Sequence, residues 1–386
     1  MKNFILQYHK QILCFFIQRY LYLNISLDRR CKLMESVSGY SSKSVSSSNI
    51  DILQLLAFVV LPVRLVYAWM YISAPLRRVV LASGKLDPNS PLWVGHKFNS
   101  FLPHASNILW LHDFVRYLVL HPDLLASFLW VFTIIELLTG LGIALGLLSR
   151  LSAIGGTLLP LGMLLGAGWQ GATCLDEWQI GSTGVAMGLT LFFAGSGVLS
   201  VDCLLMNKYP KLKESGWFKW LGSGPIFDNP AFNKIAIIGA IFALFVTMGT
   251  NQYFQGGVWG KLHNFGKVLD VKVSNAHIQN GNLVFEAYRI SGSSAAMAWI
   301  PRIDLIKDGK VIYTWDQKAI TSLPPSSVKN IYINKAKINQ YALGMRLGAK
   351  AIITLPLPQN LNLTHGQYTL VLHEIGGQKF STTFTY

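Results

Sequence analysis

The sequence predicts a membrane-embedded bundle of α-helices followed by an all-β domain with an immunoglobulin-like sandwich fold. Of its 386 residues, 51% are hydrophobic and only 13% are charged, whereas soluble domains carry about 25% charged residues. Several apolar runs approach the roughly 20 residues that cross a hydrocarbon core. After residue 256 the pattern changes to short segments rich in Val, Ile, Tyr and Thr, which is typical of strands.

Residues 1–50 are expected to lie outside both domains, as an N-terminal extension and linker. An apolar stretch over 12–27 is interrupted by Gln18 and Arg19, and a Ser-rich tract follows over 36–48. Such tracts behave as flexible linkers. We therefore expect a helix bundle over 51–255 and a β domain over 256–386. Whether translation starts at Met1 or at Met34 is left open.

Four to five membrane spans are predicted in the bundle, making it a multi-pass protein of the cell membrane. The candidate spans are 52–74, 124–148, 151–172, 180–201 and 235–250. Glycines recur in the middle three, for example Gly142, Gly156 and Gly188. Small residues let membrane helices approach closely, so we expect a compact bundle.

The distribution of Lys and Arg predicts the orientation of these spans. Arg150 and a group of lysines over 208–234 lie in connections on one side, whereas the connection holding Asp176 and Glu177 has no basic residue. Basic residues are retained in the cytoplasm. The acidic connection and the β domain are therefore expected outside. Basic residues over 77–97 oppose this orientation, but that connection is about 50 residues long, and the rule weakens for long loops.

The β domain is predicted from its short segments and from the turns between them. Asn280-Gly281, Asp308-Gly309 and Gly376-Gly377 are hairpin-type turns. Seven or eight strands over some 120 residues fit an immunoglobulin-like sandwich. The expected strands are 267–273, 283–290, 302–306, 311–315, 330–333, 349–355, 368–373 and 380–386.

Two ionisable residues, Arg64 and Glu136, lie well inside predicted spans. Each costs about 3 kcal/mol at the centre of a bilayer unless it is paired or hydrated, so we expect the two to pair in the bundle interior. Two interpretations stay open. The pair is structural, or Glu136 exchanges protons with a bound quinone while Arg64 polarises it.

The connection over 169–179 combines groups that could carry chemistry. It holds Cys174, the carboxylates Asp176 and Glu177, and the indoles of Trp169 and Trp178. The acids are also ordinary at a helix N-terminus, and the indoles are ordinary at a membrane interface. A reactive thiolate needs positive surroundings, which would have to come from the β domain.

A basic β domain could bind small anions. Residues 253–386 carry 14 basic and 6 acidic side chains, and guanidinium groups match oxyanions. Arg289, Arg302 and Arg346, together with Lys350, could gather around a dianion, or they could simply lie on solvated strand faces. Nucleic acid is not expected as a partner, because clustered basic and aromatic residues are missing.

No metal or covalent cofactor motif is recognised in the sequence. The four cysteines form no CxxC and no zinc spacing. His96, His104, His112 and His121 recur every eight or nine residues, but this spacing does not match one helix face, so axial haem ligation is not favoured.

Two segments carry a resemblance to a known enzyme family. Residues 168–181 read GWQGATCLDEWQIG and precede a glycine-rich run to Gly197; this segment resembles DoxD, the membrane subunit of thiosulfate:quinone oxidoreductase. The segments 257–260, 298–301 and 314–316, reading GVWG, AWIP and TWD, resemble the companion subunit DoxA. Both are joined here in one chain over about residues 50–386.

The resemblance implies that two thiosulfate ions are oxidised to tetrathionate and that two electrons pass to a membrane quinone. It also implies that the enzyme is a thiosulfate dehydrogenase (quinone) and that its partners are thiosulfate, quinone and membrane lipid. A homo-oligomer or a respiratory-chain partner is possible, and this question stays open. The alternative is a non-catalytic accessory or sulfur-compound-binding subunit of a respiratory complex. On the enzymatic reading, the expected catalytic residues are Cys174, Asp176, Glu177, Glu136 and Arg64, and the expected substrate-binding residues are Arg289, Arg302, Arg346, Trp169 and Trp178.

Overall fold

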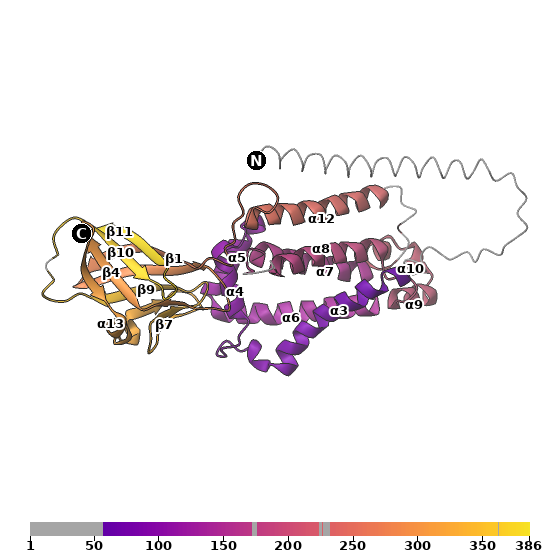
Figure 1. Ribbon diagram of the computed structural model, residues 1–386. Helices are drawn as coiled ribbons and strands as arrows, with labels where there is room; N and C mark the ends of the chain where they lie inside the picture. The colour runs from indigo at the N-terminus through magenta and orange to yellow at the C-terminus, as the bar shows by residue number, and fades with distance from the viewer. Residues whose placement is uncertain (1–56, 172–175, 224–225, 227–231, 362) are drawn as a thin grey trace, which may run out of the picture. The chain divides into compact units, whose positions relative to one another are not determined.

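The computed structural model describes residues 57–171, 176–223, 226, 232–361 and 363–386. Helices occupy the region up to Gln255, and antiparallel strands dominate from Asp270 onward (Figure 1). The change from helix to strand falls where the hydrophobic pattern changes. The extension expected over 1–50 lies outside the described residues.

Three of the described helices are long and apolar enough to cross a membrane: α6 (Pro122–Leu145), α7 (Ser149–Ala167) and α12 (Phe232–Gln255). The other two predicted spans also contain helices, α3 (Leu61–Leu76) and α8 (Asp176–Ala194). The first part of the chain therefore contains three candidate membrane-spanning helices among the described residues, while four to five spans remain a prediction.

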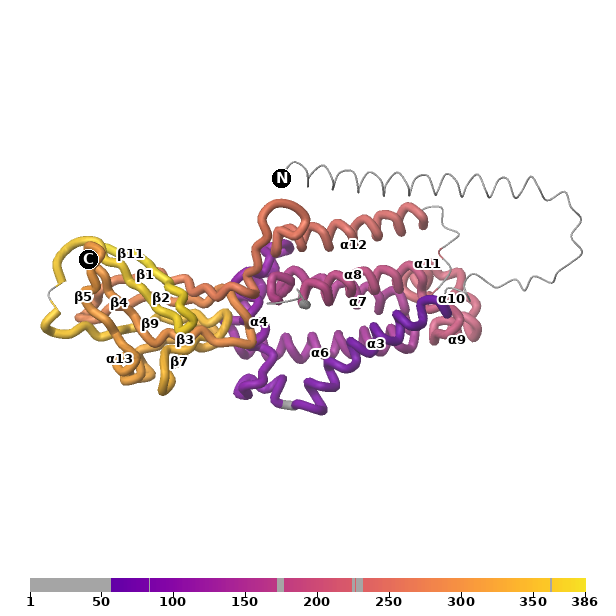
Figure 2. The backbone as a smooth tube through the Cα atoms, in the orientation of Figure 1, coloured from indigo at the N-terminus to yellow at the C-terminus, as the bar shows by residue number. Residues whose placement is uncertain are grey.

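Glycines bring the helices of the bundle into close contact, as their recurrence predicts. A Cβ atom on Gly140 of α6 would lie 2.9 Å from side-chain atoms of Tyr71 and Ile72 on α3, and one on Gly188 of α8 would lie 2.4 Å from Thr157 on α7. Helix α12 packs against α8 and lies beside it in the backbone trace (Figure 2). Close packing of small residues is a common source of helix association in lipid.

Short helical segments cover both ends of the bundle. Leu109 and Trp110 at the end of η4 have positive φ angles, so the helical path changes direction before α5 begins at Leu111. The short segments are η1 (Arg77–Leu81), η2 (Ser83–Lys85), α4 (Gly95–Phe101), η3 (Leu102–His104), η4 (Ile108–Trp110), α5 (Leu111–Leu120), α9 (Val201–Lys208), α10 (Lys211–Glu214) and α11 (Gly216–Leu221).

The β domain contains three antiparallel sheets within the described residues, with strand orders β1-β2-β9-β6, β11-β10-β4-β5 and β3-β8-β7. Helix α13 (Gln317–Thr321) and the 3₁₀ segment η5 (Pro325–Ser327) interrupt the strands. The strands are β1 (Asp270–Gln279), β2 (Asn282–Ser291), β3 (Ala298–Ile300), β4 (Arg302–Lys307), β5 (Lys310–Trp315), β6 (Val328–Asn330), β7 (Ala336–Ile338), β8 (Leu343–Met345), β9 (Lys350–Pro356), β10 (Gln367–His373) and β11 (Lys379–Thr385).

Alternate residues of both four-stranded sheets form one hydrophobic core. On β2 the side chains of Leu283, Phe285 and Ala287 are fully buried, and Leu370 and Leu372 of β10 belong to the same cluster. The three predicted hairpin turns connect β1 to β2, β4 to β5, and β10 to β11. An all-β domain is thus confirmed, whereas strands β3, β7 and β8 were not predicted.

Candidate functional site

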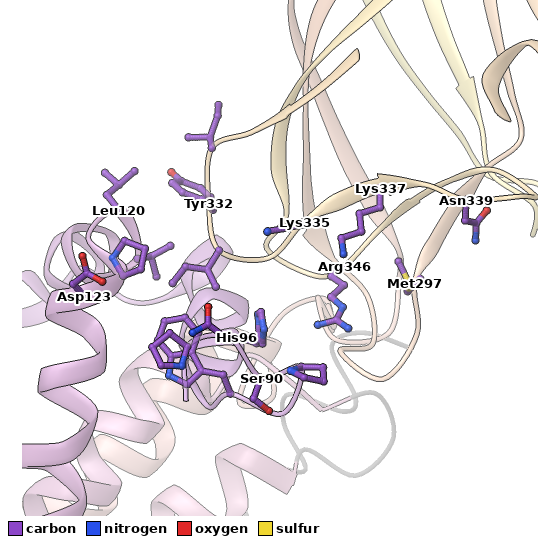
Figure 3. A pocket seen from close by; sticks show the side chains of 18 of the residues that line it. Ser90, His96, Leu120, Asp123, Met297, Tyr332, Lys335, Lys337, Asn339 and Arg346 are labelled. Atoms are coloured by element: carbon purple, nitrogen blue, oxygen red, sulfur yellow. The ribbon is translucent and has the colours of Figure 1, made fainter. Parts of the chain in front are cut away.

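A pocket of about 830 Å³ lies where the helical region meets the β domain (Figure 3). The helical region contributes residues from the segment before α4 and from the α5–α6 junction, and the β domain contributes residues around β3, β7 and β8. Its size is in the range of small-molecule sites. Neither region alone forms this pocket.

The β-domain side of the pocket is cationic. Lys335 and Lys337 flank the buried Ala336 of β7, so the strand alternation exposes both ammonium groups on the same face. Arg346 follows β8 and is also exposed. Figure 3 shows these three side chains on one side and His96 on the other. Such a wall attracts small anions.

His96 on α4 is held in a defined orientation by Asn334. The amide nitrogen of Asn334 donates to the carbonyls of His96, at 3.0 Å, and Leu347, at 2.7 Å. The amide oxygen of Asn334 is therefore the acceptor for His96 Nδ1, at 2.9 Å, so Nδ1 carries a proton. Burial lowers the pKa of His96, and the charges of Arg346, Lys335 and Lys337 lower it further. The hydrogen bond with Asn334 opposes this shift, but the pKa of His96 stays below its ordinary value.

Buried amide contacts fix the two sides of the pocket together. Asn99 of α4 donates to the carbonyl of Gly348 at 2.9 Å and accepts from the backbone N–H of Asn334 at 2.6 Å. A Cβ atom on Gly348 would lie 2.4 Å from the Asn99 carbonyl, and its φ of +78° also favours glycine. Because Asn99 is fully buried, these bonds are shielded from water.

The helical side of the pocket is mainly apolar. Trp93, Val119 and Leu120 line it, with the Pro122 ring at the start of α6. Trp93 is 3% exposed, and its indole N–H has no partner among the described residues. A buried donor without a partner costs about 1–3 kcal/mol. His96 and the carboxylate of Asp123 also line this side. The pocket therefore combines one cationic wall with a mainly apolar wall that carries one acidic side chain.

The described residues of the expected loop, 169–171 and 176–179, lie at the same end of the bundle. Trp169 is buried and donates its indole N–H to the carbonyl of Phe101 at 3.0 Å, and Trp178 donates to Thr250 Oγ1 at 3.0 Å. Both indoles are thus bonded within the protein. Cys174 lies outside the described residues, and Asp176 is the first residue of α8.

Lys97 of α4 supplies a positive charge that the sequence analysis did not place near this loop. Its ammonium group contacts Gln170 Oε1 at 2.9 Å and Glu177 Oε1 at 3.1 Å. A lysine of the helical region is therefore a basic neighbour of the acidic loop. Its salt bridge with Glu177 links this loop to α4.

The arginines of the β domain have separate partners instead of gathering around one anion site. Arg289 is fully buried and donates to the carbonyls of Ser291, Ser293, Ala296 and Met345. Burial lowers its pKa to about 10. Its donors are occupied, so Arg289 does not act as an open anion ligand.

Arg302 donates to Asp304 at 2.8 Å, and Asp304 also accepts from Thr314 and contacts His373 Nε2, each at 2.8 Å. Burial opposes ionisation of Asp304, but these partners leave its pKa below the usual value. Lys350 pairs with Glu286 at 3.0 Å. Among the predicted basic residues only Arg346 lines the pocket.

The predicted pair between Arg64 and Glu136 is wrong. Arg64 donates to the carbonyls of Ala144, near the C-terminal end of α6, and of Ser196 and Leu199. Glu136 instead forms an ion pair with Arg78. Arg78 belongs to η1, a π-helical turn that continues α3, so an arginine assigned to a connection reaches the bundle.

The four histidines considered for a metal do not converge. His112 contacts Asp113, and His121 contacts the carbonyl of Tyr117. His104 stacks on Phe265 with ring centroids 4.0 Å apart, and burial lowers its pKa to about 4. Within the described residues, no three His, Cys, Asp or Glu side chains are placed to share a metal ion.

Two family models match this chain, and their boundaries follow the two structural regions. Residues 59–227 match the TQO small subunit DoxD, and residues 254–383 match the TQO small subunit DoxA. The two matches together cover most of the chain and confirm the resemblance read from the sequence. The pocket takes His96 from the first match and Lys335, Lys337 and Arg346 from the second.

Proposed function

We propose, from the premise that this chain belongs to the DoxD and DoxA families of TQO small subunits, that it oxidises thiosulfate and reduces a membrane quinone. Two thiosulfate ions join through their terminal sulfur atoms to give one tetrathionate ion and two electrons. The quinone takes up these electrons and two protons to give a quinol. The bundle anchors the enzyme in the membrane, and the β domain lies on the extracytoplasmic side.

The observation that carries the proposal is the cationic pocket between the two family regions. Lys335, Lys337 and Arg346 place three positive charges on its wall, which suits a dianion. The site needs both regions, and this gives a physical reason for joining them in one chain. Cys174, Asp176, Glu177 and Glu136 remain proposed participants in proton handling or assembly.

Substitution of single cations tests the assignment of the pocket. A dianion about 5 Å from one positive charge gains about 1.7 kcal/mol in water, and ordinary salt reduces this to about 1 kcal/mol. Lys337→Gln and Arg346→Gln should therefore each raise the KM for thiosulfate about fivefold. Lys310→Gln, at an exposed position of β5, is the matched control and should leave KM unchanged.

The measurement is thiosulfate oxidation by the purified full chain with a water-soluble electron acceptor, over a series of salt concentrations. The KM effects of Lys337→Gln and Arg346→Gln should shrink as salt rises. Equal KM values in the pocket variants and the control would remove the pocket from thiosulfate binding. No thiosulfate oxidation by any well-folded form would favour the accessory-subunit alternative.

A further inference from the structure

We infer that the pocket between the helical region and the β domain holds the quinone ring and thiosulfate at the same time, so that electrons pass between them by direct contact. The inference rests on the proposed function and adds a shared site to it. It assigns the apolar helical wall of the pocket to the quinone and the cationic wall to the sulfur oxyanions.

The size and lining of the pocket support more than one occupant. A volume of about 830 Å³ is much larger than a single small inorganic anion needs and is typical of sites for drug-sized ligands. The cations lie on the β-domain side, whereas the lining residues Trp93, Val119 and Leu120 belong to the helical region. A flat apolar ring and a dianion would therefore prefer different walls of one cavity.

The position of the pocket suits a ligand that arrives from the membrane. Pro122 lines the pocket and is the first residue of α6, one of the helices long enough to span, so this wall lies near the end of a span. Leu120 is 42% exposed and Leu124 is 44% exposed. These side chains give the rim an apolar surface that lipid or a quinone tail can contact.

Polar groups on the helical wall could bind the quinone oxygens. His96 Nδ1 is engaged by Asn334, which leaves Nε2 as its second proton-carrying position. His96 can therefore take a proton from solvent and pass it to a reduced quinone.

The electron balance closes without a further reactant. Each of two thiosulfate ions gives up one electron as the bond between their terminal sulfur atoms forms. The quinone accepts both electrons and takes two protons from solvent. By contrast, Glu136 lies fourteen residues after Pro122 on α6, about 21 Å along the helix, so a quinone bound there would not touch thiosulfate in the pocket.

Steady-state kinetics distinguish a shared pocket from separate sites. Initial rates of the full chain in lipid nanodiscs are measured over a grid of thiosulfate and short-tailed quinone concentrations. Direct transfer requires all reactants to be bound together, so the double-reciprocal lines should intersect. Parallel lines, the pattern of a ping-pong reaction, would overturn the inference while leaving the proposed function intact.

A photoreactive azidoquinone provides an independent test without turnover. Its cross-links in the wild-type chain should map to peptides containing Trp93, Val119 or Leu120, and cross-links confined to the α3–α6 contact around Glu136 would contradict the inference. Leu120→Trp should raise the KM for quinone. The ratio of mutant to wild-type KM for quinone should be at least five times the same ratio for a water-soluble acceptor. Phe114→Trp, on α5 but outside the pocket lining, is the matched control and should preserve both values.

The failure of the two proposals can be told apart. Loss of all thiosulfate oxidation, including that with the water-soluble acceptor, would count against the proposed function. Normal oxidation with cross-links outside the pocket would count against the shared site alone.

Discussion

The ion pair between Arg78 and Glu136 should show strong energetic coupling. Their side chains are 16% and 11% exposed, and Glu136 lies on a predicted membrane-spanning helix. Removing one partner leaves the other charge buried and unpaired, which costs about 3 kcal/mol or more. The single changes Arg78→Leu and Glu136→Leu should each destabilise the chain by that amount.

The double change should cost much less than the sum of the two single changes, because it leaves no unpaired charge. We expect a coupling energy of at least about 2 kcal/mol. The assay is a double-mutant cycle on the purified full chain, with unfolding followed by denaturant titration in mixed micelles.

Arg64 provides the control for this cycle. Its carbonyl partners include Ala144, which lies about 12 Å along α6 from Glu136. Arg64→Leu and Glu136→Leu should therefore be additive within about 0.5 kcal/mol. Additive losses for Arg78 with Glu136, together with coupling for Arg64 with Glu136, would refute the reasoning.

Three further outcomes are expected. The pKa of His104 is about 4 in the folded chain and about 6.5 in the unfolded chain, so the unfolded chain binds a proton more readily. The free energy of unfolding should therefore fall as pH drops from 6.5 to 4. His104→Phe should reduce this fall in acid-unfolding curves. A membrane-impermeant thiol reagent should label Cys174 and spare Cys203 in intact cells, and the reverse would invert the orientation. Glu177→Gln and Cys174→Ser should lower turnover in well-assembled protein, and full activity in both would reduce the loop to a structural turn.

The long helices and the turns of the β domain could be predicted because each leaves a local signal. Helix α6 is a long run that is apolar except for a few polar residues such as Glu136, and Asn280-Gly281 adopts the positive φ angles that this dipeptide favours. Strands β3, β7 and β8 have three residues each, which is too short for an alternating pattern to stand out.

The ion pair and the pocket depend on contacts that no local pattern reveals. Arg78 follows α3 in a stretch assigned to a connection, and only the π-helical continuation brings it to Glu136. His96 and Asn334 are separated by 238 positions. One feature of the sequence does point to the pocket cations. Lys335 and Lys337 are two positions apart, so in an extended strand their side chains lie on the same face.

Arg289 illustrates a signal that was present and could have been used. It continues the inward series Leu283, Phe285 and Ala287 on β2, all of which are buried. Strand alternation therefore predicts an inward guanidinium, and a buried guanidinium needs acceptors nearby. The carbonyls around Arg289 satisfy that need, so the residue stabilises the domain rather than binding substrate.

The most direct test of the account is the stoichiometry of thiosulfate-dependent quinone reduction by the purified full chain in nanodiscs. One quinol and one tetrathionate should form for every two thiosulfate ions consumed, with no other protein added. A correctly folded chain that binds both compounds but produces neither quinol nor tetrathionate would contradict it.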